Sequence, residues 1–165
     1  GTAAGMKLPV FDKSTDDRLP ERHWRRVDSD PDVVLIEGWC VGAPPCPAAD
    51  LERAINDTEL RQDLDGYWRR RMHYSWTDYH LALQSRLNEV WYIRVPGWDC
   101  VVDWRWRQEC ELARPNLGRV EDVRNFLGPF ERVVRHMQNS HDEWADVILA
   151  ADRDHCIGPK RIEGE

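Results

Sequence analysis

The chain has 165 residues, of which 41% are hydrophobic and 32% are charged. This length suits one domain, 1–165, and the apolar fraction is sufficient for a sizeable core. Acidic residues outnumber basic ones by 30 to 23, a formal net charge of −7 that disfavours general nucleic-acid binding. No apolar run approaches the roughly 18–20 residues of a membrane span, so we expect no transmembrane segment and no membrane partner.

Three short apolar runs predict strands, each bounded by polar residues or by Pro and Gly. They are Asp32–Glu37, Glu89–Val95 and Ala145–Ala151. Their β-branched composition without polar alternation is typical of strands buried on both faces of a parallel sheet. Lys7–Phe11 could form part of a fourth strand, although Pro9 restricts it to a sheet edge or a loop.

Helical patterns fill the segments between these runs. A capping box at Asn56 opens a first helix that extends as far as Leu87, with Gly66 as a potential break. The other two predicted helices are 101–113 and 120–137. The last has an apolar side made of Val123, Phe126, Leu127, Phe130, Val133, Val134 and Met137. Its Gly128-Pro129 pair allows a kink or two shorter helices.

Strands that alternate with helices predict an α/β fold, a three-layer parallel sheet with helices on both faces. Ligands of such sheets bind beyond the carboxyl ends of the strands. Glu37 ends the first predicted strand and is followed by Gly38, so its carboxylate could orient Mg²⁺ there. It could equally solvate a loop.

Two further polar clusters are candidate binding elements. The loop Phe11–Arg18 could present Asp12, Lys13 and Arg18 to a polar substrate, or it could be a solvated charged loop. Arg105 and Arg107 could close over phosphate oxygens, or they could pair with acidic neighbours along an amphipathic helix.

The cysteines and the missing motifs narrow the chemistry. Five cysteines without Cys-x-x-Cys spacing, and no apolar leader, predict reduced thiols in a cytoplasmic protein. No Cys or His pair has zinc-ligand spacing with a matching second pair. The sequence also contains no GxxxxGK[ST], GxGxxG or GxSxG motif. Among the six histidines, only His155 is singled out, because it follows a predicted strand end. From the residues alone, a structural role is favoured there over a catalytic one.

Read together, several segments resemble the glycerate 3-kinases, a family in the P-loop kinase group with uridine kinase and phosphoribulokinase. The resemblance covers nearly the whole chain in the family's order. It is carried by Leu8–Lys13 with Asp16–Arg18, Ile36–Gly42, Asn56 with Glu59, Asp63 with Gly66–Arg69, Trp104-Arg105 with Gln108-Glu109, and Ala145–Asp152 with His155.

The resemblance implies a kinase that uses ATP and Mg²⁺ to phosphorylate a small hydroxy acid, most specifically glycerate. An acceptor loop at 8–20 would hold the acid through Phe11, Asp12, Lys13, Asp17 and Arg18. Glu37 would serve the metal and the γ-phosphate, and a lid at about 96–115 would carry Arg105. Arg107 and His155 would then belong to the nucleotide side of the site.

The family's phosphate-binding loop and its strand have no counterpart in this sequence. The resemblance therefore implies the C-terminal portion of a P-loop kinase-like fold, whose own turnover is expected to be low. Three interpretations stay open: a glycerate-type kinase, a related kinase with another acceptor such as a nucleoside, and a non-catalytic relative that binds an anion or a small acid. An incomplete sheet would also expose an edge, which favours homo-oligomers.

Overall fold

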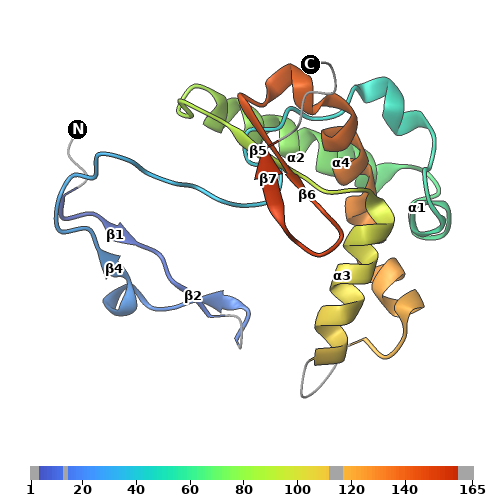
Figure 1. Ribbon diagram of the computed structural model, residues 1–165, viewed down its shortest axis with the longest axis horizontal. Helices are drawn as coiled ribbons and strands as arrows, with labels where there is room; N and C mark the ends of the chain where they lie inside the picture. The colour runs from blue at the N-terminus through green and yellow to red at the C-terminus, as the bar shows by residue number, and fades with distance from the viewer. Residues whose placement is uncertain (1–3, 13–14, 112–116, 160–165) are drawn as a thin grey trace. The chain divides into compact units, whose positions relative to one another are not determined.

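The computed structural model describes residues 4–12, 15–111 and 117–159 (Figure 1). By its internal contacts the chain divides into two compact units, Gly1–Glu37 and Gly38–Glu165. The larger unit carries the long helices of the described residues. That the chain forms a single domain, 1–165, stays a prediction.

The small unit consists of two short antiparallel ribbons and a 3₁₀ turn, η1 (Glu21–His23). Strand β1 (Lys7–Leu8) pairs with β4 (Arg25–Arg26), and β2 (Phe11–Asp12) pairs with β3 (Asp17–Arg18). The predicted strand Lys7–Phe11 is thus split in two. Pro9, which has no N–H to donate to a ladder, lies between β1 and β2.

The prediction of a buried strand at Asp32–Glu37 is wrong. The segment forms no strand, and Figure 1 draws it as irregular backbone. The exposed fractions of its apolar side chains are 81% for Val33, 70% for Val34, 91% for Leu35 and 51% for Ile36. The physical reason is a missing neighbour: a strand needs a ladder partner, and no strand among the described residues pairs with this segment.

The larger unit contains a three-stranded sheet in the order β5-β6-β7. The pair β5 (Trp91–Arg94) and β6 (Val147–Ala151) is parallel, which confirms two predicted strands. The third strand, β7 (Ile157–Pro159), was not predicted and runs antiparallel to β6. The fold is therefore mixed α/β, and the predicted three-layer parallel sheet is not confirmed.

Helices account for most of the larger unit (Figure 1). They are η2 (Ala48–Glu52), α1 (Asp57–Gln62), α2 (Tyr67–Gln84), α3 (Trp98–Glu111) and α4 (Val120–Trp144). Asn56 caps α1 as predicted, since its side-chain oxygen accepts the Glu59 amide at 2.8 Å. The break at Gly66 is also confirmed: its φ of 70° is left-handed backbone, which favours glycine. In contrast, α4 runs unbroken through Pro129.

The core lies between the helices in two clusters. Trp98 and Val102 of α3 pack against Val123 and Leu127 of α4, and a second cluster joins Ala43, Trp76 and Val133. The predicted apolar side of α4 is thus confirmed at its buried positions.

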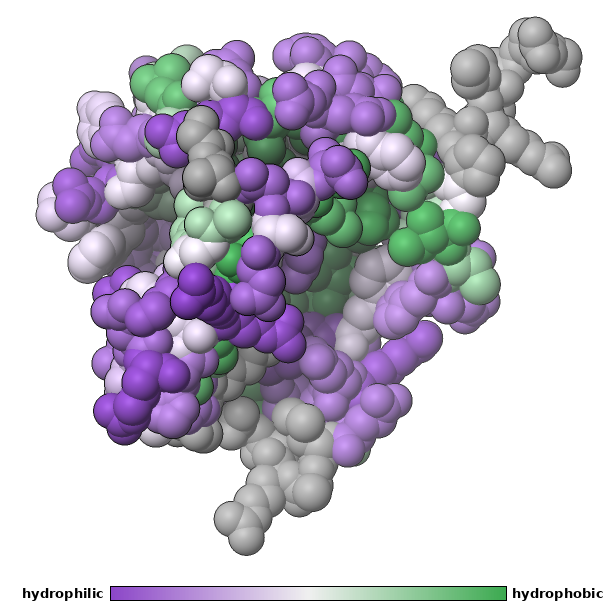
Figure 2. Space-filling model, turned by 90° about the vertical axis from the view of Figure 1, so that its left-hand side faces the viewer, coloured by the Kyte–Doolittle hydropathy of each residue, from purple (hydrophilic) through white to green (hydrophobic). Residues whose placement is uncertain are grey.

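Two members of that predicted apolar side remain exposed. Phe126 is 51% exposed and Phe130 is 39% exposed, because they lie beyond the packed stripe. Phe130 finds partial cover against the ring of Trp39, at a centroid distance of 4.9 Å. Figure 2 shows green apolar side chains among the purple polar side chains on the face that it presents.

Candidate functional site

An open cavity of about 640 Å³ lies at the carboxyl ends of the parallel strands β5 and β6. This is the edge at which open α/β sheets bind ligands. The cavity is lined by Arg94, Val95, Pro96, Gln138, Asn139, His141, Ala151, Asp152 and Arg153. Its residues come from the end of β5, from the last third of α4 and from the turn after β6, three segments that the crossover through α4 brings together.

Two arginines give the cavity its positive side. Arg94 is the last residue of β5, and Arg153 follows β6 by two positions. The opposing carboxylate of Asp152 is already engaged, because its Oδ1 accepts the amides of Asp154 and Cys156, each at 2.9 Å. The guanidinium groups are therefore the lining groups best suited to an anion, since planar Arg binds carboxylate or phosphate oxygens in pairs.

The α4 wall of the cavity is held in place by hydrogen bonds and ring contacts. The side chain of Gln138 donates to the carbonyl of Val95 at 3.2 Å, which ties α4 to the end of β5. His141 is 7% exposed, and its ring lies 5.4 Å from the ring of Tyr92. Burial raises the pKa of Tyr92 to about 12, so its hydroxyl stays protonated at neutral pH.

The turn between β6 and β7 contacts α3. The indole nitrogen of Trp104 donates to the carbonyl of Arg153 at 3.0 Å, and its ring meets the ring of His155 edge-on at 4.3 Å. His155 is exposed, with a φ of 65°. The predicted nucleotide residue His155 thus lies on the turn that contributes Arg153 to the cavity, but it does not itself line the cavity.

The predicted lid arginine is paired along its own helix. Arg105 donates to Gln108 at 2.6 Å and forms an ion pair with Glu109, whose side chain is fully buried. Its guanidinium also lies 5.6 Å from the ring centroid of Phe126. This structure therefore shows the amphipathic-helix alternative for Arg105.

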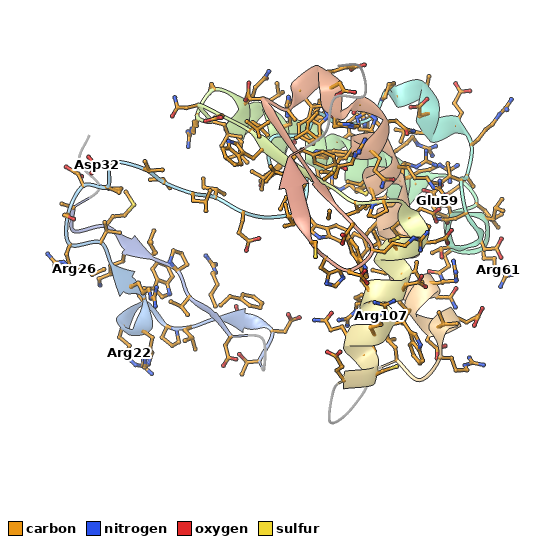
Figure 3. The ribbon with its side chains drawn as sticks, viewed as in Figure 1. Arg22, Arg26, Asp32, Glu59, Arg61 and Arg107 are labelled. Atoms are coloured by element: carbon orange, nitrogen blue, oxygen red, sulfur yellow. The ribbon has the colours of Figure 1, made fainter. Side chains whose placement is uncertain are left out.

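Arg107 lies two residues after Arg105 in α3, and its side chain is exposed (Figure 3). Residues 112–115 of the predicted lid lie outside the described residues. A lid function for this region stays a prediction.

The predicted acceptor loop forms the β2–β3 ribbon. Phe11 pairs with Arg18 and Asp12 pairs with Asp17, so four of the five predicted acid-binding residues share one hairpin. Phe11 is 54% exposed, and Arg18 is exposed as well. The fifth, Lys13, lies outside the described residues.

Glu37 is the last residue of the small unit, and its side chain is exposed. Within the described part of the chain, no group of three or more His, Cys, Asp or Glu side chains is arranged to hold a metal ion. Burial raises the pKa of the nearby Cys40 thiol to about 11, which keeps it protonated and a poor nucleophile at neutral pH.

The fold and the cavity define an α/β protein with a ligand-type cleft at its sheet edge, and comparison with known proteins gives a more specific relationship. No protein-family model matches the chain. The chain is 27% identical over 136 residues to a chloroplastic D-glycerate 3-kinase of Arabidopsis thaliana, an alignment that covers 76% of this chain and 26% of that protein.

A solved structure shares the fold. It is the D-glycerate 3-kinase of Cryptococcus neoformans var. grubii, with a TM-score of 0.68 and 21% sequence identity, covering 93% of this chain and 58% of that one. The two comparisons confirm the resemblance to glycerate 3-kinases that the motifs predict. The chain spans only about a quarter of the curated relative's length and a little over half of the solved relative's length.

Sequence reasoning missed most of the cavity's lining. Arg94 and Arg153 each stand at or just after a predicted strand, and that position was the available signal. Gln138 and His141 carried no local signal, because their place depends on how α4 packs against β5.

No helix among the described residues is long and apolar enough to cross a membrane.

Proposed function

We propose that the chain is the acceptor and lid portion of an ATP-dependent phosphotransferase that acts on a small hydroxy acid, with glycerate as the preferred acceptor. The observation that carries the proposal is the alignment with a D-glycerate 3-kinase over 76% of the chain. The arginine-lined cavity at the carboxyl edge of β5 and β6 supports it, because phosphoryl transfer depends on positioning and positive charge around the migrating group.

In this proposal the β2–β3 ribbon binds the acceptor. Arg18, with Lys13, would neutralise the acid's carboxylate, and the carboxylates of Asp12 and Asp17 would accept hydrogen bonds from its hydroxyl groups. Phe11 would cover the bound acid from water.

The residues of this chain suit Mg²⁺ better than they suit the nucleotide phosphates. Mg²⁺ is commonly held by one or two carboxylates together with phosphate oxygens and water, so the exposed carboxylate of Glu37 is chemically suited to it. Arg105 and Arg107 would supply charge from the lid, and His155 would lie on the nucleotide side. The nucleotide phosphates lack their usual cradle, because the 165 residues contain no GxxxxGK[ST] loop.

An experiment that adds a phosphate-binding loop to the chain tests this proposal. The chain would be fused to the loop-bearing segment of a glycerate 3-kinase, and ADP release would be followed with D-glycerate, with nucleosides, with pantothenate and with water alone. We expect D-glycerate to accelerate ADP release at least tenfold over water. No acceleration by glycerate would reject the substrate, and a faster nucleoside or pantothenate reaction would identify a related kinase instead.

The acceptor ribbon gives a matched pair of variants in the same fusion. Arg18→Ala should raise the KM for glycerate about tenfold or more, because a hydrogen bond to a charged group contributes about 1.5–3 kcal/mol. Arg22→Ala removes another exposed arginine of the same unit (Figure 3) and should leave the KM unchanged. Equal effects of the two variants would mean that the ribbon acts only through general charge.

A second candidate function is favoured by the cavity, whose lining residues all belong to the larger unit of this chain. As a non-catalytic relative, the chain would bind a small acid or phosphate there without turnover. Titration calorimetry with D-glycerate and with inorganic phosphate should then show binding that Arg153→Ala weakens at least tenfold. Arg61→Ala, at an exposed arginine that does not line the cavity, should leave this binding intact. In the same experiment, Mg·ATP should bind more weakly than millimolar, about −4 kcal/mol, unless a nucleotide site exists without the loop.

A further inference from the structure

The turn between β6 and β7, residues 152–156, is held together by its own polar groups. Besides the two amides that the Asp152 side chain accepts, the Asp152 amide donates to the carbonyl of Cys156 at 3.0 Å. The amide of His155 donates to the carbonyl of Asp152 at 3.2 Å. All five residues are exposed. Hydrogen bonds that water can reach protect a loop only weakly, so such a turn opens readily unless a neighbouring element supports it.

One residue of this turn has a backbone conformation that most side chains avoid. The φ of His155 is 65°, in the left-handed region, which histidine enters more often than most residues do. A conformation of this kind persists where the surrounding structure favours it. At His155 the surrounding structure includes the indole of Trp104, which meets the histidine ring edge-on at a centroid distance of 4.3 Å.

Trp104 belongs to a helix that is itself fixed in the core. Val102 of α3 is fully buried, and together with Trp98 it packs against α4. Trp104 follows Val102 by two positions, about 200° around the helix, so it lies on the side of α3 away from this core cluster. From there its indole nitrogen donates to the carbonyl of Arg153 at 3.0 Å. A helix anchored in the core therefore restrains the backbone of the exposed turn.

Arg153 transmits this restraint to the cavity. Its side chain lines the cavity together with Arg94 from the end of β5. Two guanidinium groups bind one anion well when their positions are set before the anion arrives, because ordering a loop on binding costs affinity. Trp104 does not line the cavity, so it can act on an anion there only through the turn.

We propose that Trp104 is a positioning residue of the cavity, which holds residues 152–156 in the conformation that places Arg153 for binding an anion. A residue outside the cavity thus sets the affinity of the cavity for a carboxylate or a phosphate. The inference rests on the second candidate function, anion binding in this cavity, and it does not require phosphoryl transfer.

Titration calorimetry of the chain with inorganic phosphate and with D-glycerate tests the proposal. Trp104→Phe keeps an aromatic ring beside His155 but removes the N–H group that donates to the carbonyl of Arg153. It should weaken binding at least threefold, because a neutral hydrogen bond is worth a factor of about 2 to 12 in an equilibrium constant. Trp68→Phe makes the same change at an exposed tryptophan of α2 that does not line the cavity, and it should leave binding unchanged. Circular dichroism of each variant verifies that it is folded.

A double-mutant cycle shows whether Trp104 acts through Arg153. In Arg153→Ala the backbone carbonyl remains, but the guanidinium is gone. Adding Trp104→Phe to Arg153→Ala should therefore weaken binding no further. A general structural effect of Trp104→Phe would instead lower the affinity equally in both backgrounds.

Hydrogen exchange measured by NMR reports on the turn without any anion. The amides of Asp154 and Cys156 donate to the Asp152 side chain, and their exchange should be at least threefold faster in Trp104→Phe than in the unsubstituted chain. His155→Asn removes the ring contact and keeps a residue type that tolerates left-handed backbone, so it should also speed this exchange.

The possible failures can be told apart. If the unsubstituted chain binds neither anion, anion binding in the cavity is rejected and the role of Trp104 in it is rejected as well. If the chain binds an anion that Arg153→Ala weakens, but Trp104→Phe binds that anion as tightly, the second candidate function stands and the positioning role is overturned. Equal losses from Trp104→Phe in the two backgrounds, or unchanged exchange at Asp154 and Cys156, would also overturn the positioning role.

Discussion

Replacing Arg132 by methionine should lower the free energy of unfolding by about 3–5 kcal/mol, the cost of leaving a buried charge without its partner. Arg132 is 4% exposed, and its Nε donates to Glu59 at 2.9 Å. Its two terminal nitrogens donate to the carbonyls of Asp50 and Arg53 at 2.6 and 2.7 Å. One guanidinium on α4 thus holds both α1 and the end of η2, and its loss leaves the Glu59 carboxylate buried.

Chemical denaturation followed by circular dichroism measures the effect, and helix α1, which carries Glu59, offers a control. Arg61 of α1 pairs with Asp57 at 3.1 Å, but the two side chains are 78% and 76% exposed, and Arg61 lies at the outer edge of the larger unit (Figure 3). Arg61→Met should therefore change stability by less than about 0.5 kcal/mol.

Removing both charges of the buried pair separates the strength of the pair from the cost of breaking it. The double variant Arg132→Met with Glu59→Leu should be more stable than Arg132→Met alone, because no charge is left buried. A double variant that loses as much as the sum of its two single variants would show that the residues act independently, against the contacts described above.

Local signals in the sequence were enough to predict most of the helices and two of the strands. These signals are local, because each depends on residues only a few positions apart. Examples are the cap made by Asn56, the left-handed backbone at Gly66 and the apolar runs of β5 and β6. The segment Asp32–Glu37 shows the limit of such signals. Its pattern indicates that the side chains favour burial, but it says nothing of which neighbour would bury them.

The same limit explains the candidate site. The polar cluster Phe11–Arg18 could be singled out because its residues are adjacent in sequence, although a loop was expected there and not the β2–β3 ribbon. The cavity, in contrast, assembles Arg94, Gln138 and Arg153 from three separate elements. In a sequence, an arginine after a strand is as typical of a solvated surface residue as of a ligand-binding residue. The buried pair of Arg132 and Glu59 was invisible for the same reason, since 73 positions separate its members.

Introducing a single methyl group at Gly128 should destabilise the larger unit by about 2 kcal/mol. Gly128 lies where α4 crosses α1, and a Cβ there would meet the Thr58 side chain at 2.1 Å from Oγ1 and 2.7 Å from Cβ. Thr58 is 8% exposed, so it cannot swing into solvent, and the two helices must separate. Overpacking of this kind costs about 1–3 kcal/mol.

Two further terms act in opposite directions. Alanine is a better helix former than glycine by about 1 kcal/mol, which stabilises the variant. Separation of the helices, however, stretches the hydrogen bond from the Asn56 side chain to the carbonyl of Gly128, now 2.8 Å, and displaces Glu59 from Arg132. The steric and electrostatic costs therefore exceed the gain in helix propensity, and Gly128→Ala is expected to be destabilising.

Denaturation of Gly128→Ala beside two other variants distinguishes crowding from a general effect of alanine. Gly118→Ala places the same methyl group where nothing lies within 4 Å, and it should change stability by about 0.5 kcal/mol or less. Adding Thr58→Gly to Gly128→Ala removes the atoms that the new methyl group meets, so this double variant should regain stability relative to Gly128→Ala alone. If Gly128→Ala proves as stable as Gly118→Ala, then α1 and α4 do not approach each other closely in solution. The contact between Glu59 and Arg132 would then also have to loosen, because α1 carries Glu59 at that same crossing.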